Sequence, residues 1–216
     1  MTAPGQLLRG APALAVIGAW LCGCSSAVVV DSSFPTPLVE PLPARVGLFF
    51  SDELYDYIHS EALPQQSTWT IDLGDANVAM LEPLLRTMFV ETRTLDTLPL
   101  SAADRADLDG VIVPVLEKFE FDIPFGERDE FVEVWMQYQI GLYRTDGQVV
   151  LEWPVSGYGK FETGGKRVEA VEQAAIFAMR EVGATISTKF AEQPDVGYWL
   201  EEVQDATGNA NVAIVR

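Results

Sequence analysis

The stretch that decides the fold is 131–160, FVEVWMQYQIGLYRTDGQVVLEWPVSGYGK, where two alternating apolar segments flank the dipeptide Asp146-Gly147. Asp-Gly between alternating hydrophobic runs is typical of a two-residue β-hairpin turn. A turn there places Trp135 opposite Tyr158 and puts the apolar residues of both strands on one face. A slip of one residue would move one apolar set to the other face, so the pattern specifies the register.

The segments on either side of this hairpin complete an α+β pattern. Residues 111–121 alternate like a further strand of the same meander, and 167–192 have the apolar spacing of a long helix. Upstream, 68–73 alternate as a strand, and 75–89 carry a helical apolar stripe with Asp75 as the candidate N-cap. The sequence therefore predicts an α+β fold, with a mainly antiparallel sheet that ends in a C-terminal meander and is packed by two main helices on one face.

The composition restricts the possible functions. Lys and Arg number 14 against 32 Asp and Glu, a net charge of −18, whereas nucleic-acid binding requires a basic surface. Hydrophobic residues make up 48% of the 216, which suffices for one domain with its own core. The only cysteines, Cys22 and Cys24, lie near the N-terminus, and His59 is the single histidine. We therefore expect no nucleic-acid partner, no disulfide framework and no thiolate metal site.

The first 24 residues indicate the compartment. Residues 11–21 are apolar over the length of a secretory signal segment, about half of what spans a bilayer. They lead into Leu21-Cys22-Gly23-Cys24, which resembles the lipobox of bacterial lipoproteins, with 1–23 as the signal peptide and Cys24 as the acylated residue. An ordinary cleaved signal peptide with a chance cysteine is the alternative. The resemblance also implies, through Ser25, sorting to the outer membrane, where acyl chains anchor a domain that faces the periplasm.

The chain from Cys24 onward divides into three parts. Residues 24–44 contain four prolines, a density that favours extended polyproline II and predicts a tether between membrane and domain. An arm that packs on the domain through 28–30 is the alternative. Residues 45–200 are expected to form a single α+β domain, and 201–216 a loosely specified C-terminal tail.

Residues that could carry chemistry are sparse. The glycines and basic residues between Gly157 and Arg167 lack the spacing of a phosphate-binding loop, and Gly157 and Gly159 are expected to make room for a helix. His59 has no serine or cysteine in a recognisable nucleophile setting, so we expect it at the surface or in a turn. Adjacent acids such as Asp52-Glu53 are expected by chance in so acidic a chain. We therefore predict no catalytic residue, no cofactor and no metal ion.

The candidate binding residues are aromatic side chains in places where polar ones are usual. Phe125 lies in the turn expected between the first two strands of the meander. On the sheet face opposite the core, the alternation gathers four more aromatic residues: Phe131, Trp135, Tyr143 and Tyr158. Such a face is either a second buried layer, covered by the N-terminal arm or the C-terminal segment, or a patch that binds a partner.

The chain as a whole resembles small proteobacterial outer-membrane lipoproteins. The resemblance depends on the lipobox at Cys24, the proline-rich segment, and one domain that ends in a meander and a long helix. Residues 68–89, TWTIDLGDANVAMLEPLLRTMF, and 151–160, LEWPVSGYGK, are similar to segments of a largely uncharacterised lipoprotein group. Similar layouts occur in YajG-type lipoproteins and in auxiliary lipoproteins of lipid-transport ABC systems. The resemblance implies no catalytic residues.

These observations lead to three hypotheses of function. The first is a non-enzymatic, membrane-anchored module that binds an envelope protein in transport or assembly. The second is a carrier or chaperone of lipid or lipopolysaccharide, which would require an apolar cavity between sheet and helices. The third is an envelope hydrolase, for which the sequence offers no nucleophile–base pair. Exposure of Trp135 and Tyr158 would distinguish the first hypothesis from the second.

Overall fold

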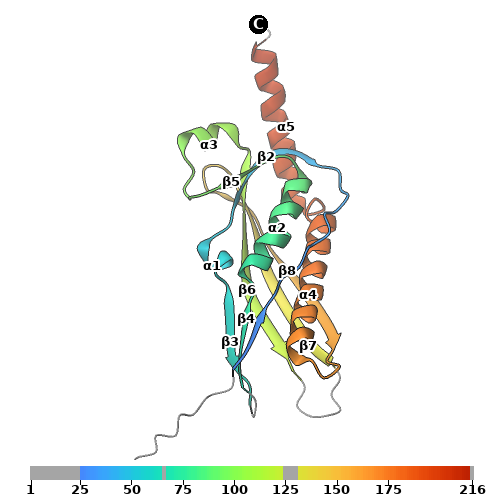
Figure 1. Ribbon diagram of the computed structural model, residues 1–216. Helices are drawn as coiled ribbons and strands as arrows, with labels where there is room; N and C mark the ends of the chain where they lie inside the picture. Colours follow the sequence, from blue (N-terminus) through green and yellow to red (C-terminus); the bar gives the residue numbers. More distant parts are fainter. Residues whose placement is uncertain (1–24, 65–66, 124–130, 215–216) are drawn as a thin grey trace, which may run out of the picture.

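The computed structural model describes residues 25–64, 67–123 and 131–214, with side chains described as far as residue 206 (Figure 1). The elements of these residues are, in chain order, β1 (Ser25–Val29), β2 (Leu42–Phe49), α1 (Asp52–Tyr55), β3 (Ile58–Ala62), β4 (Thr68–Asp72), α2 (Gly74–Met88), β5 (Phe89–Leu95), α3 (Ala102–Asp107), β6 (Gly110–Asp122), β7 (Phe131–Tyr143), β8 (Val149–Glu162), α4 (Arg167–Lys189) and α5 (Pro194–Ile214). They confirm the predicted α+β class.

The larger sheet has five strands in the order β5-β2-β6-β7-β8. Its last three strands form the predicted antiparallel meander, and β7 pairs with β8 in the predicted register, with Trp135 opposite Tyr158. By contrast, β2 runs parallel to both β5 and β6. Parallel neighbours require crossover connections, and here α2 precedes β5 and α3 precedes β6. The sheet is therefore mixed, and the meander forms its antiparallel part.

A second sheet of three strands, in the order β1-β4-β3, contributes to the same core. In it, β1 is parallel and β3 antiparallel to β4. The alternation predicted for 68–73 is confirmed, because Trp69, Ile71 and Leu73 are buried. The ring centroid of Trp69 lies 6.4 Å from that of Phe121 in β6, so the small sheet packs against the inner face of the large one.

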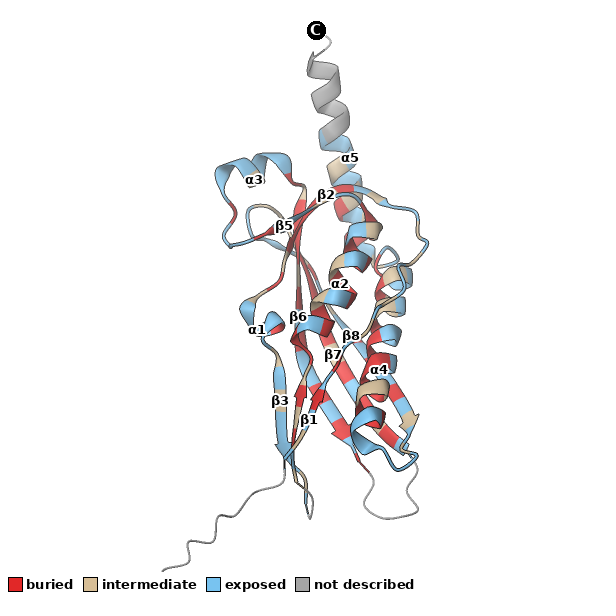
Figure 2. Cartoon of the chain, in the orientation of Figure 1, coloured by how far each residue is buried: buried red, intermediate tan, exposed pale blue. Residues whose placement is uncertain are grey.

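The two main helices, α2 and α4, lie side by side on one face of the large sheet, as predicted (Figure 1). Figure 2 shows buried residues concentrated where the helices meet the strands. A Cβ atom at Gly159 would lie 1.8 Å from the carbonyl oxygen of Ala174, and one at Gly157 would lie 2.2 Å from that of Ala178. The prediction that these two glycines make room for a helix is therefore confirmed.

A buried polar contact crosses the core between α2 and β7. Asn77 and Tyr138 are both fully buried, and the Tyr138 hydroxyl donates a hydrogen bond of 2.5 Å to Oδ1 of Asn77. The amide of Asn77 donates in turn to the carbonyl oxygen of Leu54, 3.3 Å away. Burial raises the pKa of Tyr138 far above its usual value, so the hydroxyl keeps its proton and remains a donor. The contact thereby joins α1, α2 and β7.

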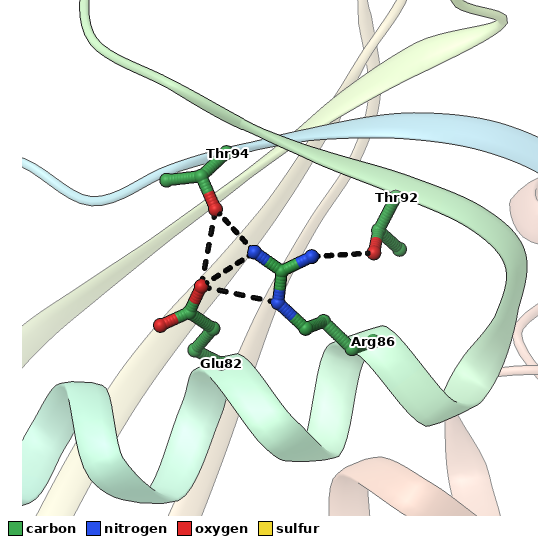
Figure 3. Close-up of polar contacts among 4 residues, drawn as sticks. All are labelled: Glu82, Arg86, Thr92 and Thr94. Carbon is green, nitrogen blue, oxygen red and sulfur yellow. Dashed lines mark hydrogen bonds and ion pairs between the residues drawn. The ribbon is translucent and has the colours of Figure 1, made fainter.

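At the surface, α2 is tied to the edge strand β5 by a polar cluster (Figure 3). The guanidinium of Arg86 donates to Oε1 of Glu82 at 2.7 and 3.1 Å, and to the hydroxyl of Thr94 at 2.7 Å. It also reaches the hydroxyl of Thr92 at 3.3 Å, and Thr94 donates to Glu82 at 3.1 Å. Exposed ion pairs contribute only about 0–1 kcal/mol each. The cluster therefore orients β5 on α2 more than it stabilises the fold.

The N-terminal segment differs from the predicted tether. Residues 25–29 form a strand of the small sheet, and Val28 and Val30 are buried in the core. Farther along, 34–37 line a pocket together with residues of α2 and α4, and Phe34 packs against the core. The backbone of β1 finds hydrogen-bonding partners in β4, and the two valines bury apolar surface. The prediction of a tether over 24–44 is therefore wrong for 25–37, which is a packed arm.

The C-terminal segment also differs from its prediction. In place of a loosely specified tail, the backbone continues as the helix α5 to Ile214. Val196 and Trp199 of its first turns are buried, so the beginning of α5 docks on the core. The remainder of α5 extends beyond the end of the large sheet (Figure 1).

Smaller differences concern the ends of helices. Asp72, rather than Asp75, accepts a hydrogen bond from the first backbone N–H of α2, at 3.1 Å. The segment 51–62 contains both a short helix, α1, and a strand, β3. The connection over 99–109 contains α3, whose N-cap Ser101 accepts a hydrogen bond of 3.1 Å from the backbone N–H of Asp104.

Candidate functional site

The outer face of the large sheet, opposite the helices, carries the exposed aromatic residues. Even-numbered residues of β7 are buried, so Trp135 projects from the outer face. Tyr158 of β8 lies directly beside it, with the two ring centroids 5.4 Å apart and the rings inclined at 42°. Each of these two side chains is 40% exposed. Trp135 and Tyr158, which we call the aromatic pair, are therefore covered by neither the N-terminal arm nor α5.

Charged side chains continue from the aromatic pair toward the start of β7. Nζ of Lys160 donates to Oε1 of Glu133 at 2.9 Å and lies 4.5 Å from the ring centroid of Phe131. The hydrogen bonds that Lys160 and Tyr158 give to Glu133 lower the pKa of Glu133. The same contact with Glu133 raises the pKa of Lys160, while desolvation and the bond to Glu133 raise that of Tyr158. At neutral pH Glu133 and Lys160 therefore stay charged, and Tyr158 keeps its proton.

A pocket of about 310 Å³ opens beside the aromatic pair, and Lys118 and Glu120 are among its polar lining residues. Glu181 of α4 also lines it and reaches the sheet edge, where its Oε2 accepts a hydrogen bond of 2.7 Å from the backbone N–H of Tyr158. The N–H groups of even-numbered β8 residues therefore point away from β7, toward the edge of the sheet. Pro154 has that parity, so it removes no hydrogen bond from the ladder.

The other predicted binding residues are placed differently. Phe131 lies four residues before Trp135 on the same face, beyond the Glu133–Lys160 ion pair, and is 43% exposed. Tyr143 lies on the same face but eight residues along β7 from Trp135, about 26 Å at 3.3 Å per residue. Its ring packs over Gly141. Phe125 lies outside the described residues. The four aromatic residues expected to gather therefore share a face without forming one patch, because alternation predicts the face of a residue and not its neighbours along the strand.

The described residues contain no group of three or more His, Cys, Asp or Glu side chains that could hold a metal ion. His59, expected at the surface or in a turn, lies in β3 with its ring centroid 5.0 Å from that of Phe119 and 5.6 Å from that of Phe121. Its Nε2 is 3.3 Å from Oε2 of Glu61. The His59 ring thus packs on two aromatic rings while its Nε2 faces Glu61.

Two features of this face were missed by the sequence reasoning. Glu181 is 23 positions from Tyr158, and no local pattern indicates that an acid on α4 will reach the edge of β8. The segment 96–109 covers the far end of the outer face, and its signal is the apolar triplet Leu98-Pro99-Leu100 together with Leu108. Within 25–64, 67–123 and 131–214, no helix is long and apolar enough to cross a membrane.

Comparison with known proteins finds similarity in structure alone. No family model matches the sequence, and no curated protein matches it in sequence. A DUF330 protein from Xanthomonas campestris is 11% identical, with a TM-score of 0.49 over 85% of this chain and 99% of its own. A homolog of neuraminyllactose-binding hemagglutinin from Helicobacter pylori is 9% identical, with a TM-score of 0.48 over 82% of this chain and 100% of its own.

A third similar structure is a minor lipoprotein from Acinetobacter baumannii, which is 7% identical, with a TM-score of 0.41 over 69% of this chain and 93% of its own. The structural neighbours thus include bacterial lipoproteins and a DUF330 protein. At these identities and TM-scores, the names describe those proteins, and no residue role passes from them to this chain.

Proposed function

We propose that this protein is a non-enzymatic, membrane-anchored binding protein of the bacterial envelope, which serves as an accessory module in transport or assembly. The observation that carries the proposal is the aromatic pair, which is exposed on a β-sheet, stacked ring against ring, and next to a pocket. Tryptophan and tyrosine are enriched among the side chains that dominate protein–protein binding energy. Held by two paired strands, these rings lose little conformational freedom on binding, which favours affinity.

The charges around the aromatic pair favour a protein partner with a basic rim. Glu120 and Glu181 lie close to the two rings, while Glu133 is paired with Lys160, in a chain of net charge −18. Such a field accelerates the approach of a surface of opposite charge, while the apolar contact itself holds the complex. The partner would therefore insert apolar side chains against the rings and place Lys or Arg around them.

The membrane anchor is proposed at Cys24, which lies outside the described residues. The motif Leu21-Cys22-Gly23-Cys24 supports acylation, and Ser25 supports sorting to the outer membrane of a proteobacterium, with the domain facing the periplasm. Because β1 begins at Ser25, an acylated Cys24 would attach the folded domain to the lipid directly. Stable attachment requires more than one acyl chain, which the lipoprotein modification supplies.

Metabolic labelling with a fatty acid tests this anchor. Cys24→Ala is expected to abolish both the label and the recovery of the protein with outer membranes. Cys22→Ala is the matched control and should retain both. Full labelling of the Cys24→Ala protein would contradict the proposed anchor and would leave the binding face to be judged by its own experiment.

Site-specific photo-crosslinking in the cells that make the protein tests the binding face. A photoreactive phenylalanine analogue at Trp135 is expected to give an adduct of defined mass with one envelope protein. The same analogue at Thr188, on the exposed side of α4, is the control and should give no such adduct. Tyr158→Ser should weaken the Trp135 adduct without changing the circular dichroism spectrum. Equal adducts at both positions, or none at Trp135, would contradict the proposal.

The other two hypotheses have less support. A carrier of lipid or lipopolysaccharide would need a large cavity between sheet and helices. The pocket described between α2, α4 and 34–37 holds about 220 Å³, below the range of about 300–1,000 Å³ that is usual for ligand sites. For a hydrolase, the described surroundings of His59 supply aromatic rings and Glu61 where a hydroxyl or thiol nucleophile would be required.

A further inference from the structure

A larger pocket lies at the opposite end of the outer face from the site of the aromatic pair. The segment 96–109, between β5 and β6, folds over this end and packs there in a small hydrophobic cluster separate from the main core. Between this segment and the turn that joins β7 to β8 is a pocket of about 510 Å³. Its apolar lining is formed by Leu98, Leu100, Val111 and Val113. The volume is within the range of small-molecule sites, about 300–1,000 Å³.

Two arginines line this pocket, and they differ in their partners. Arg144 forms an ion pair with Glu202 of α5, so its charge is compensated. Arg105 of α3 forms an ion pair with none of the described carboxylates, and its Nε lies 3.5 Å from the carbonyl oxygen of Ser101. The guanidinium of Arg105 therefore retains donors that can serve a ligand.

The acids that are nearest to Arg105 in the sequence are held by other arginines. Arg93 binds Asp104 at 3.1 Å and Asp107 at 3.6 Å. Asp109 is 3.0 Å from Arg45. The folded structure thus directs these carboxylates away from Arg105 and leaves a positive group beside an apolar cavity, in a chain whose net charge is −18.

We propose that this pocket binds a single-chain amphiphile with an anionic head group, a carboxylate or a phosphate monoester. The chain would lie on the apolar lining, and the head group would accept hydrogen bonds from Arg105, whose planar guanidinium matches both anions. At about 30 Å³ per heavy atom, the volume that a water molecule occupies in the liquid, the pocket accommodates on the order of 17 heavy atoms. A dodecyl chain with its head group has this size.

This inference goes beyond the proposed function and does not depend on it, because the pocket and the aromatic pair share no residue. The apolar lining also distinguishes the ligand from a free inorganic anion, which would leave that surface unused. A protein partner of the aromatic pair and an amphiphile in the larger pocket could be bound at the same time.

Isothermal titration calorimetry with dodecyl phosphate and with dodecanoate, each below its micelle concentration, tests the site. The chain from Ser25 onward is used, because every described element lies within it and no detergent is then needed. We expect saturable binding of one molecule per chain. Dodecyl maltoside, with the same chain and an uncharged head group, should bind at least about tenfold more weakly, since charge-assisted hydrogen bonds are worth that factor or more. The better of the two anions identifies the head group.

Four variants assign the binding to this pocket. Arg105→Gln should weaken binding of the anions about tenfold or more. Arg167→Gln, which removes the same charge from an exposed position of α4, is the control and should have no effect. Asp146→Asn removes a negative charge from the pocket lining, keeps an acceptor for the backbone N–H of the turn, and should strengthen binding. Leu98→Asp, at a side chain that is 42% exposed, should abolish binding without unfolding the protein.

Three results would overturn the inference: no heat of binding with either anion, binding of dodecyl maltoside as tight as that of the anions, or equal effects of Arg105→Gln and Arg167→Gln. Trp135→Ala should bind dodecyl phosphate as tightly as the unchanged protein. A failure of the amphiphile site and a failure of the proposed partner site can therefore be told apart.

Discussion

Alanine in place of Gly159 is expected to force α4 away from the large sheet. The new Cβ would lie 1.8 Å from the carbonyl oxygen of Ala174 and 2.7 Å from the backbone nitrogen of Ala178. The shorter distance falls below ordinary van der Waals contact by more than about 1.5 Å. Both neighbours are backbone atoms, so no side-chain rotation relieves the contact. Overpacking a core costs about 1–3 kcal/mol, and we expect this substitution at the upper end, about 3 kcal/mol.

Urea unfolding, followed by tryptophan fluorescence and by circular dichroism, measures this cost. A loss of about 3 kcal/mol at an unchanged slope would lower the urea midpoint and reduce the Tm by about 6–12 °C for a domain of this size. Coincident transitions by the two probes are required before the free energies are compared.

Gly183→Ala is the matched control on the same helix. The nearest atoms to a Cβ at Gly183 are Sδ of Met80 at 3.8 Å and Cδ2 of Leu84 at 3.9 Å, so the methyl group fits. Alanine is favoured over glycine inside a helix by about 0.5–1 kcal/mol, and this variant should be at least as stable as the unchanged protein. If Gly159→Ala unfolded within about 0.5 kcal/mol of the unchanged protein, the close approach of α4 to β8 would be refuted.

Three further predictions concern single side chains. Tyr138→Phe leaves Oδ1 of the buried Asn77 without its donor and should lower the free energy of unfolding by about 1–3 kcal/mol in urea, and a neutral effect would contradict the buried contact. Lys160→Met should raise the pKa of Glu133 in a carboxyl NMR titration, because the hydrogen bond from Lys160 is the main cause that lowers this pKa. A lowered pKa in the folded state stabilises the fold above about pH 4.3, and that stabilisation is lost as the pH falls through the folded pKa. Trp135→Ala should lower the free energy of unfolding by about 0.5–1.5 kcal/mol, mostly from the lost contact with Tyr158. A loss of roughly 3–5 kcal/mol in urea unfolding, the cost of removing a buried tryptophan, would place the ring in the core.

The parts of the fold that the sequence predicted are those with a local cause. Asp146-Gly147 specifies a turn, and the alternation on both sides of it leaves a single register that buries both apolar sets, so the position of Trp135 opposite Tyr158 could be read directly. The long helix α4 has an apolar stripe of its own, and Gly157 and Gly159 mark where it approaches the sheet. In these elements, each residue's neighbours are within one hairpin or one turn of helix.

The parts that it missed depend on contacts between distant segments. The prolines near residue 40 suggested a tether, but the chain before them forms β1, which pairs with β4. In this pairing Ser25 lies opposite Thr68, more than forty residues away in the sequence, and no periodic pattern indicates which two segments will pair. The candidate site was predicted in the same uneven way. The outward face of Tyr143 and its position eight residues along the strand from Trp135 could be predicted, but its place beside the larger pocket requires the segment 96–109 to fold back over the sheet.

The start of β1 at Ser25 would set the height of each site above the membrane if Cys24 is acylated. Ser26 pairs with Trp69, which contacts Phe121 near the end of β6, and Trp135 stands on the strand beside Phe121. The aromatic pair would then lie near the lipid head groups, so its partner would itself have to lie at the membrane surface. The larger pocket begins about eight residues farther along β6, at Val113, about 26 Å away at 3.3 Å per residue. Its ligand would then have to reach the pocket from the aqueous phase, because the pocket would lie too far from the bilayer to receive the ligand directly.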